Sequence, residues 1–121
     1  MKPVLWMATL GLLSATPALA QDAAKVDPKH YKVELENDQV RVLRIHYEAG
    51  EKSVMHSHPA SVAVFLTDGK VKFTTPDGKS QEAVAKAGEV QWEPGGLHLP
   101  GNVGAKAFDL ILVELKSPPA K

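Results

Sequence analysis

Short apolar runs separated by tight-turn residues constrain the fold of this chain more than any other feature. The turn sequences ND at 37–38, DG at 68–69 and PDG at 76–78 favour hairpin connections. The runs between the turns are rich in β-branched and aromatic residues, and no segment keeps a helical period over three turns. These runs are KVELE, VRVLRIHYE, SVAVFL, KVKFTT, EVQW and AFDLILVEL. We therefore expect an all-β domain, a small antiparallel barrel or sandwich.

The first 20 residues have the pattern of a secretory signal peptide. Lys2 precedes an apolar stretch from Val4 to Leu13, and the small-residue sequence ALA at 18–20 is typical of a cleavage site. The apolar stretch is shorter than the roughly 20 residues that a bilayer crossing requires. We therefore expect residues 1–20 to be removed, the protein to be periplasmic or secreted, and no membrane span to remain after cleavage.

Removal of 20 of the 121 residues leaves 101, which is enough for one domain with one core. The sequence QDAAKVDP shows no apolar period, so residues 21–30 are expected to form a flexible N-terminal arm. Residues 31–116 are expected to form the single β domain. Residues 117–121 contain two prolines and are expected to form a frayed tail.

Charge and cysteine content exclude several classes of function. The 14 basic residues become 13 once Lys2 is removed, and they face 14 acidic residues. Such a balance predicts neither a nucleic-acid partner nor an anionic-membrane partner. The sequence has no cysteine, so thiol catalysis, thiolate metal ligands and disulfide bonds are excluded, although the leader indicates an oxidising compartment.

Two histidines, His56 and His58, stand one residue apart just before an apolar run. On a strand their side chains project from the same face, so both imidazoles can converge on one metal ion. Each ring then offers one nitrogen to the ion and the other to a neighbouring group. Two core or surface histidines would give the same pattern, so the pair alone leaves metal binding open.

Two segments resemble the two sequence motifs of the cupin family. The first motif is a glycine, five residues, His-x-His, three or four residues, a glutamate, six residues and a glycine. Residues 50–69 read G-EKSVM-HSH-PAS-V-AVFLTD-G, with Val62 in the place of the glutamate. The second motif is a glycine, five residues, a proline, a glycine-containing turn, a histidine, three residues and an asparagine. Residues 88–102 read G-EVQWE-P-GGL-H-LPG-N, with a turn one residue shorter than usual.

The resemblance implies a small antiparallel β-barrel of the cupin type, also called a double-stranded β-helix or jelly roll. It further implies that His56, His58 and His98 form a three-histidine face that binds a divalent metal ion such as iron, manganese, zinc or nickel. Three neutral ligands leave the ion its full charge and open positions, where water or a substrate oxygen can be polarised. A cupin barrel whose histidines only hydrogen-bond one another is the alternative interpretation.

Other residues allow a functional and a structural interpretation. His46 could face the cavity and Arg44 could bind an anionic substrate, but a structural histidine and a salt-bridged arginine are the favoured interpretations. Asn102 is expected to support a ligand or to fix a turn. His30 is expected to have no role. Four aromatic residues are expected in the core: Phe65, Phe73, Trp92 and Phe108.

Two functions from different classes follow from the resemblance. The first is a metal-dependent oxidoreductase of the dioxygenase type, because three-histidine cupins of that type bind iron(II) with substrate and oxygen at the open positions. The second is a non-catalytic cupin of the cell envelope that binds a metal or a small ligand. A general acid or base in the cavity would favour the enzyme, and the candidates are Glu48, Glu93 and Tyr47. The partners expected are a small molecule and, as in many single-domain cupins, a second copy paired through sheet edges.

Overall fold

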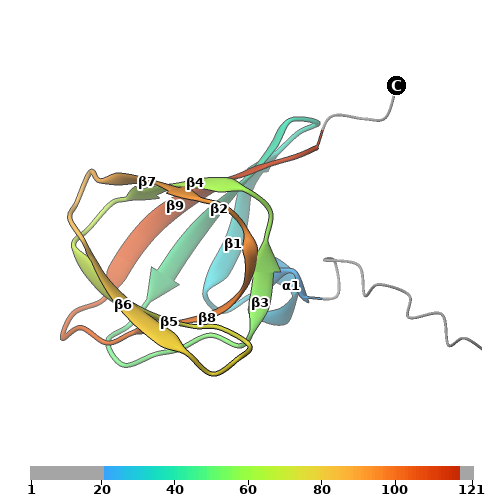
Figure 1. Ribbon diagram of the computed structural model, residues 1–121. Coiled ribbons are helices and arrows are strands. Elements are labelled where there is room, and N and C mark those ends of the chain that lie inside the picture. The colour runs from blue at the N-terminus through green and yellow to red at the C-terminus, as the bar shows by residue number, and fades with distance from the viewer. Residues whose placement is uncertain (1–20, 118–121) are drawn as a thin grey trace, which may run out of the picture.

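The computed structural model of the protein describes residues 21–117, which form two β-sheets and one short helix (Figure 1). The predicted leader lies outside the described residues, as do residues 118–121 of the predicted tail. The five-stranded sheet has the order β1-β2-β9-β4-β7, and the four-stranded sheet has the order β3-β8-β5-β6. The elements are α1 (Ala23–Val26), β1 (Tyr31–Glu36), β2 (Val40–Tyr47), β3 (His56–His58), β4 (Ser61–Phe65), β5 (Gly69–Thr74), β6 (Ser80–Ala85), β7 (Val90–Glu93), β8 (Gly96–Asn102) and β9 (Phe108–Leu115).

The two sheets curve around a common interior, and all pairings between the named strands are antiparallel (Figure 1). The predicted small antiparallel barrel is therefore confirmed. The six apolar runs contain β1, β2, β4, β5, β7 and β9. The remaining strands lie in segments with weaker patterns, and β6 was missed because Ala85 is its one buried residue.

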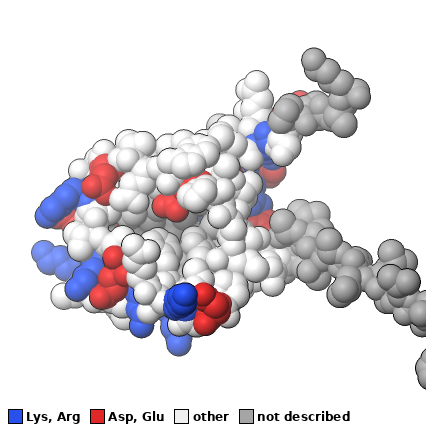
Figure 2. Space-filling view, in the orientation of Figure 1, with Lys and Arg blue, Asp and Glu red and all other residues white. Residues whose placement is uncertain are grey.

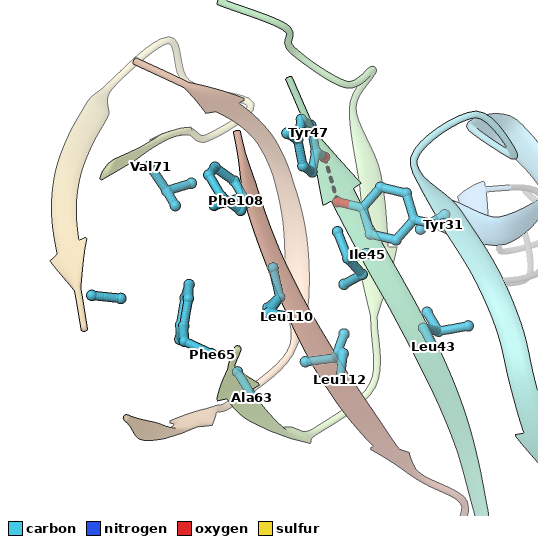
Figure 3. Close-up of a cluster of buried hydrophobic side chains, with 12 residues drawn as sticks. Tyr31, Leu43, Ile45, Tyr47, Ala63, Phe65, Val71, Phe108, Leu110 and Leu112 are labelled. Carbon is cyan, nitrogen blue, oxygen red and sulfur yellow. Dashed lines mark hydrogen bonds between the residues drawn. The ribbon is translucent and has the colours of Figure 1, made fainter. Parts of the chain in front are cut away.

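Alternate side chains of the paired strands point into the barrel and form its core (Figure 3). Every second residue of β9 is buried, as expected for a strand with one face in a core. The predicted core positions of Phe65 and Phe108 are confirmed, and Phe73 packs against them partly buried. The buried apolar side chains are Ala23, Tyr31, Leu43, Ile45, Tyr47, Ala63, Phe65, Val71, Ala85, Phe108, Leu110 and Leu112.

Residues 21–30 pack against the barrel, so the expectation of a flexible arm is corrected. Asp22 caps α1 through a hydrogen bond from the Ala24 N–H, 3.2 Å long, and Ala23 is fully buried. The helix lies beside β3, to which Asp22 is joined by a single bridge with Ser57 (Figure 1). This packing could not be predicted from an apolar period, because it depends on one buried alanine and one buried carboxylate.

Trp92 does not belong to the core, contrary to expectation. Its side chain is 59% exposed, and it pairs with Val62 on the outer face of the five-stranded sheet. The alternation of β7 therefore places the neighbouring Glu93, rather than Trp92, toward the interior, where it lines a cavity. An aromatic residue on an edge strand can stay exposed because one of its sides has no neighbouring strand to cover it.

Among residues 21–117, no helix has both the length and the apolar composition that crossing a membrane would require.

Candidate metal centre

The three predicted ligands come together on two paired strands of the four-stranded sheet. His56 of β3 is the register partner of His98 of β8, and His58 is the partner of Gly96. Gly95 and Gly96 both have positive φ, at 93° and 117°, so the turn from β7 into β8 requires glycine. A Cβ at position 95 would also lie 2.9 Å from the His58 carbonyl oxygen. The glycine pair thus allows the close approach that puts His98 opposite His56.

The nitrogens of the three imidazoles converge, and the spacing of the His56–His98 pair matches that of two ligands of one metal ion. The candidate ligand atoms of His56, His58 and His98 all lie within 4.8 Å of one another. The Nε2 atoms of His56 and His98 are 3.1 Å apart. Two nitrogens bound to one ion at about 2.0–2.1 Å, with angles between roughly 90° and 110°, lie about 2.9–3.4 Å apart. Within the described part of the chain, this cluster of potential ligands contains histidines alone.

Hydrogen bonds at Nδ1 orient two of the rings. The His56 Nδ1–H donates to the Val54 carbonyl oxygen at 2.8 Å, and the Ser53 Oγ lies 3.2 Å from the same nitrogen. The His58 Nδ1–H donates to Glu114 Oε2 at 2.6 Å. A proton on Nδ1 leaves the Nε2 lone pair free, which is the tautomer that a metal-binding histidine requires.

A buried ion-pair network holds the partner of His58. Glu114 is 2% exposed, and its second oxygen accepts a hydrogen bond from Arg41 Nε at 2.7 Å. Arg41 in turn donates from Nη1 to Asp22 Oδ2 at 2.6 Å, so the network reaches α1. Burial raises the pKa of Glu114, but the hydrogen bonds from His58 and Arg41 outweigh it and leave the pKa below its usual value. Glu114 is therefore an ionised acceptor that holds the His58 ring.

The rings of His56 and His98 are neutral at physiological pH. Burial, followed by the nearby His58, lowers the pKa of His56 to about 4. Burial together with His58 and His56 lowers the pKa of His98 to about 3. The His98 ring also stacks on Phe73, with ring centroids 5.3 Å apart. Both imidazoles are therefore uncharged. Because His56 donates from Nδ1, its Nε2 accepts a hydrogen bond from the His98 Nε2–H at 3.1 Å, and a bound cation would replace this hydrogen bond, with the His98 proton on Nδ1.

A cavity of about 150 Å³ adjoins the histidines inside the barrel. His58 and His98 form part of its wall, and Glu93 is the one residue with a carboxylate among those that line it. Burial raises the pKa of Glu93. The wall is otherwise mainly apolar and is formed by Ile45, Tyr47, Ala63, Phe65, Val71, Phe73, Pro94, Gly95, Gly96, Pro100, Phe108, Leu110 and Leu112.

On β4, the side chain that faces the cavity is that of Ala63, whereas Val62, which stands in the place of the motif glutamate, faces outward. On β4, Ser61, Ala63 and Phe65 are buried, whereas Val62 is half-buried on the outer face opposite Trp92. Ala63 lines the cavity beside the histidines. Neither position carries a carboxylate, so the expectation of a three-histidine face is unaffected.

The other polar candidates, His46 and Arg44, contact acidic side chains outside the cavity. His46 lies on the outer face of β2, where its two ring nitrogens contact Asp109 at 2.8 Å and Glu48 at 2.9 Å. Arg44 is half-exposed and forms an ion pair with Glu34, as favoured from the sequence. Neither side chain lines the cavity, and Glu48 is therefore not a candidate acid or base there.

Asn102 and Tyr47 are both buried. Asn102 stabilises a turn, and Tyr47 belongs to the core. The Asn102 amide donates to the carbonyl oxygens of Tyr47 and Lys106, and its Oδ1 accepts from the Gly104 N–H, which fixes the turn after β8. The Tyr47 hydroxyl bonds to Tyr31 at 2.6 Å (Figure 3), and burial raises the pKa of Tyr47. Tyr47 is therefore a poor proton donor near neutral pH.

His30 has a defined role, contrary to expectation. It is 6% exposed, stacks on Tyr47 with centroids 4.3 Å apart, and its Nδ1 lies 2.7 Å from Asp27 Oδ2. The same Asp27 carboxylate accepts a hydrogen bond from Ser53, which contacts His56. The segment before β1 is therefore linked to His56 through Ser53, in addition to its link to His58 through Arg41 and Glu114.

Sequence reasoning also missed Glu114, although a signal was present. In the run AFDLILVEL, Glu114 has the same parity as Phe108, Leu110 and Leu112, so alternation alone places a carboxylate on the inward face. A charged side chain that points inward among apolar side chains is expected to have a buried hydrogen-bonding or oppositely charged partner. The partner could not be read from the sequence, because His58 lies 56 residues away.

Comparison with solved structures places this architecture among known proteins. A cupin domain from Bordetella pertussis Tohama I is 26% identical, with a TM-score of 0.67 over 72% of this chain and 92% of that chain. A conserved protein with a double-stranded β-helix domain from Klebsiella pneumoniae is 24% identical, with a TM-score of 0.57 over 70% and 74%. No protein-family model and no curated protein matches the sequence.

A more distant structure comes from an enzyme. An oxalate decarboxylase variant from Bacillus subtilis is 16% identical, with a TM-score of 0.52 over 66% of this chain and 22% of that chain. At this identity the likeness shows the fold alone. The barrel topology and these comparisons together show that the chain has the fold of a small cupin domain.

Proposed function

We propose that the protein is a metal-dependent cupin oxidoreductase of the dioxygenase type that acts on a small molecule in the periplasm or outside the cell. The observation that carries the proposal is the convergence of three imidazoles, two of which, His58 and His98, line a mainly apolar cavity. His56, His58 and His98 are the residues that would hold the ion. A divalent ion bound there, such as iron(II), would supply a Lewis acid and one-electron chemistry with oxygen.

The protein's own contribution is to orient the ligands, exclude water and move a proton. The Val54 carbonyl and the Glu114 carboxylate fix the His56 and His58 rings with Nε2 directed at the cluster. The apolar wall keeps water from the reacting atoms. Burial raises the pKa of Glu93, so its carboxyl group holds a proton more readily than an exposed glutamate does and could exchange that proton with a substrate atom.

Oxygen consumption tests the proposal. Protein loaded with iron(II) should consume oxygen when candidate substrates are added, and His98→Ala should abolish that activity. Glu93→Gln should bind iron(II) as the wild type does but turn over more slowly, whereas Glu82→Gln, an exposed change on β6 outside the cavity, should match the wild type. Metal binding without oxygen consumption for any candidate would support the alternative, a non-catalytic binding protein.

The alternative function rests on the small number of ionisable groups at the cavity. Among the described residues that line it, Glu93 is the one acidic side chain and the two histidines belong to the proposed metal site. A protein that only binds a metal or a small ligand would need no further acid or base.

Export and self-association are part of the proposal. The leader pattern supports cleavage after Ala20, and N-terminal sequencing of the exported protein should find Gln21 first.

The edge strand β7 carries two exposed apolar side chains, Val90 and Trp92, which supports pairing with a second copy. Sedimentation should give the mass of two mature chains, and Trp92→Glu should shift it toward one.

A further inference from the structure

We propose that the ligand of the cavity is a monocyclic aromatic molecule with a single hydroxyl group, the size of phenol, whose oxygen faces the histidine cluster. The inference rests on the proposed function, because the three histidines are taken as the place where the ligand oxygen meets the metal. It adds the chemical class of the ligand.

The size of the cavity limits the ligand to about one ring. Its volume is about 150 Å³. A protein cavity of roughly that volume lined by leucine, isoleucine and phenylalanine stays dry and holds one benzene molecule. A two-ring molecule would need displacement of buried side chains such as Phe108 and Leu110, which belong to the core.

The wall of the cavity favours an aromatic ring over a polar ligand. Aromatic side chains reach it from both sheets: Phe65, Phe73, Tyr47 and Phe108. Aromatic side chains pack well against another ring in offset or edge-to-face geometry. Phe73 also stacks on His98, so one ring of the wall borders both the apolar space and the candidate ligands. A bound ring would therefore have apolar contacts around its edge and a polar contact at one point.

The charges around the cavity disfavour a ligand with two anionic groups. Among the described residues, neither lysine nor arginine lines it. A dicarboxylate such as oxalate could direct one carboxylate at the metal, but the second would be buried without a cationic partner. The Glu93 side chain adds like charge whenever it is ionised. Arg41 cannot compensate, because it is not part of the wall and its guanidinium is occupied by Asp22 and Glu114.

The cavity is accessible from one end of the barrel. Its lining includes the turn Glu93-Pro94-Gly95-Gly96 that leads from β7 into β8. The face shown in Figure 2 is hollowed between the two sheets, with basic and acidic atoms at its margin and acidic atoms beside the hollow. A small neutral molecule can enter by such a route past the Glu93 carboxylate without the cost of desolvating a charge of its own.

Titration of cobalt(II)-loaded protein tests the ligand class. Cobalt(II) reports a new oxygen ligand through its visible absorption spectrum, so phenol, cyclohexanol, acetate and oxalate can be compared at the same metal. Phenol should change the spectrum at the lowest concentration, cyclohexanol should bind more weakly, and oxalate should be the weakest. Tighter binding of oxalate or acetate than of phenol would overturn the inference and leave the metal site intact.

Two neighbouring residues provide matched variants. Ala63→Leu fills the cavity from its wall, whereas Val62→Leu enlarges a side chain on the outer face of the same strand. Phenol affinity should fall at least about tenfold in Ala63→Leu and stay unchanged in Val62→Leu. Leu110→Phe fills the cavity from β9 and serves if Ala63→Leu does not fold or loses cobalt(II). Unchanged phenol affinity in a folded, cobalt-loaded filling variant would contradict the inference.

Failure of the proposed function gives a different result. If the wild type takes up no cobalt(II), the metal proposal fails. Calorimetry with phenol on the metal-free protein then decides the ligand class by itself: binding that Ala63→Leu removes supports the aromatic ligand, and absence of binding overturns it.

Discussion

At the scale of single residues, the metal centre depends on which nitrogen of each imidazole is protonated. His56 and His58 are fixed by acceptors at Nδ1, and His98 is fixed by ring contacts with Phe73 and His56. The histidines could be predicted from their spacing in the sequence. Their acceptors could not, because the Val54 carbonyl depends on local backbone geometry and Glu114 lies on a strand distant in sequence.

Introducing a carboxylate at Ala63 should strengthen metal binding. Ala63→Glu places an anionic ligand beside three neutral imidazoles, so the affinity for zinc(II) or iron(II) should rise by about tenfold or more. Val62→Glu, on the outer face, should leave the affinity unchanged. Calorimetric titration measures both. A folded Ala63→Glu variant with no gain in affinity would show that position 63 does not face a metal.

The stability of the metal-free protein should fall on mild acidification. The pKa values of His56 and His98, about 4 and about 3, lie below the ordinary value of 6.5, so the unfolded chain takes up these protons first. The free energy of unfolding therefore decreases as the pH drops from 6.5 toward 4, by about 2 kcal/mol per histidine between pH 7 and pH 5.

Urea denaturation at several pH values measures this dependence. The variant His98→Gln removes one of the two buried titrating groups, so its stability should change less over the same range. A wild-type stability that is constant between pH 7 and pH 5 would contradict the assignment of neutral, buried imidazoles.

At the scale of elements, the segment before β1 supports the site from outside the barrel. Asp22 reaches His58 through Arg41 and Glu114, and Asp27 reaches His56 through Ser53. The barrel strands could be predicted because alternating apolar runs and turn residues are local signals. Residues 22–30 could not, because their order derives from contacts with β2 and β3 rather than from their own composition.

Loss of the Asp22 carboxylate should weaken metal binding at a distance. Asp22→Ala leaves Arg41 without one of its two buried partners and loosens Glu114 and His58, so metal affinity should fall about 10- to 100-fold. Lys25→Ala, an exposed change on the same helix, should have little effect. Zinc(II) titration with a competing chelator measures the affinity, and circular dichroism checks the fold. Wild-type affinity in a folded Asp22→Ala would contradict a supporting role for this segment.

At the scale of the whole molecule, the two sheets surround a cavity. His58 of β3 and His98 of β8 form part of its wall. The turn signals and alternation predicted the barrel, and the resemblance in two separated motifs predicted which histidines meet. The local pattern of β7 misplaced Trp92, which is exposed rather than in the core. Which side of a strand faces inward depends on the register with its neighbours, and a single segment does not fix that register.

The central claim, a three-histidine centre for a divalent metal ion, is tested most directly by metal analysis of the folded protein. Protein purified without chelators and then equilibrated with iron(II), manganese(II), zinc(II) or nickel(II) should retain about one ion per chain of at least one of these metals. The double variant His56→Ala/His98→Ala should fold and retain none, whereas His46→Ala, on the outer face, should retain the ion as the wild type does. Wild-type protein that retains no ion, or a double variant that retains as much as the wild type, would contradict the account.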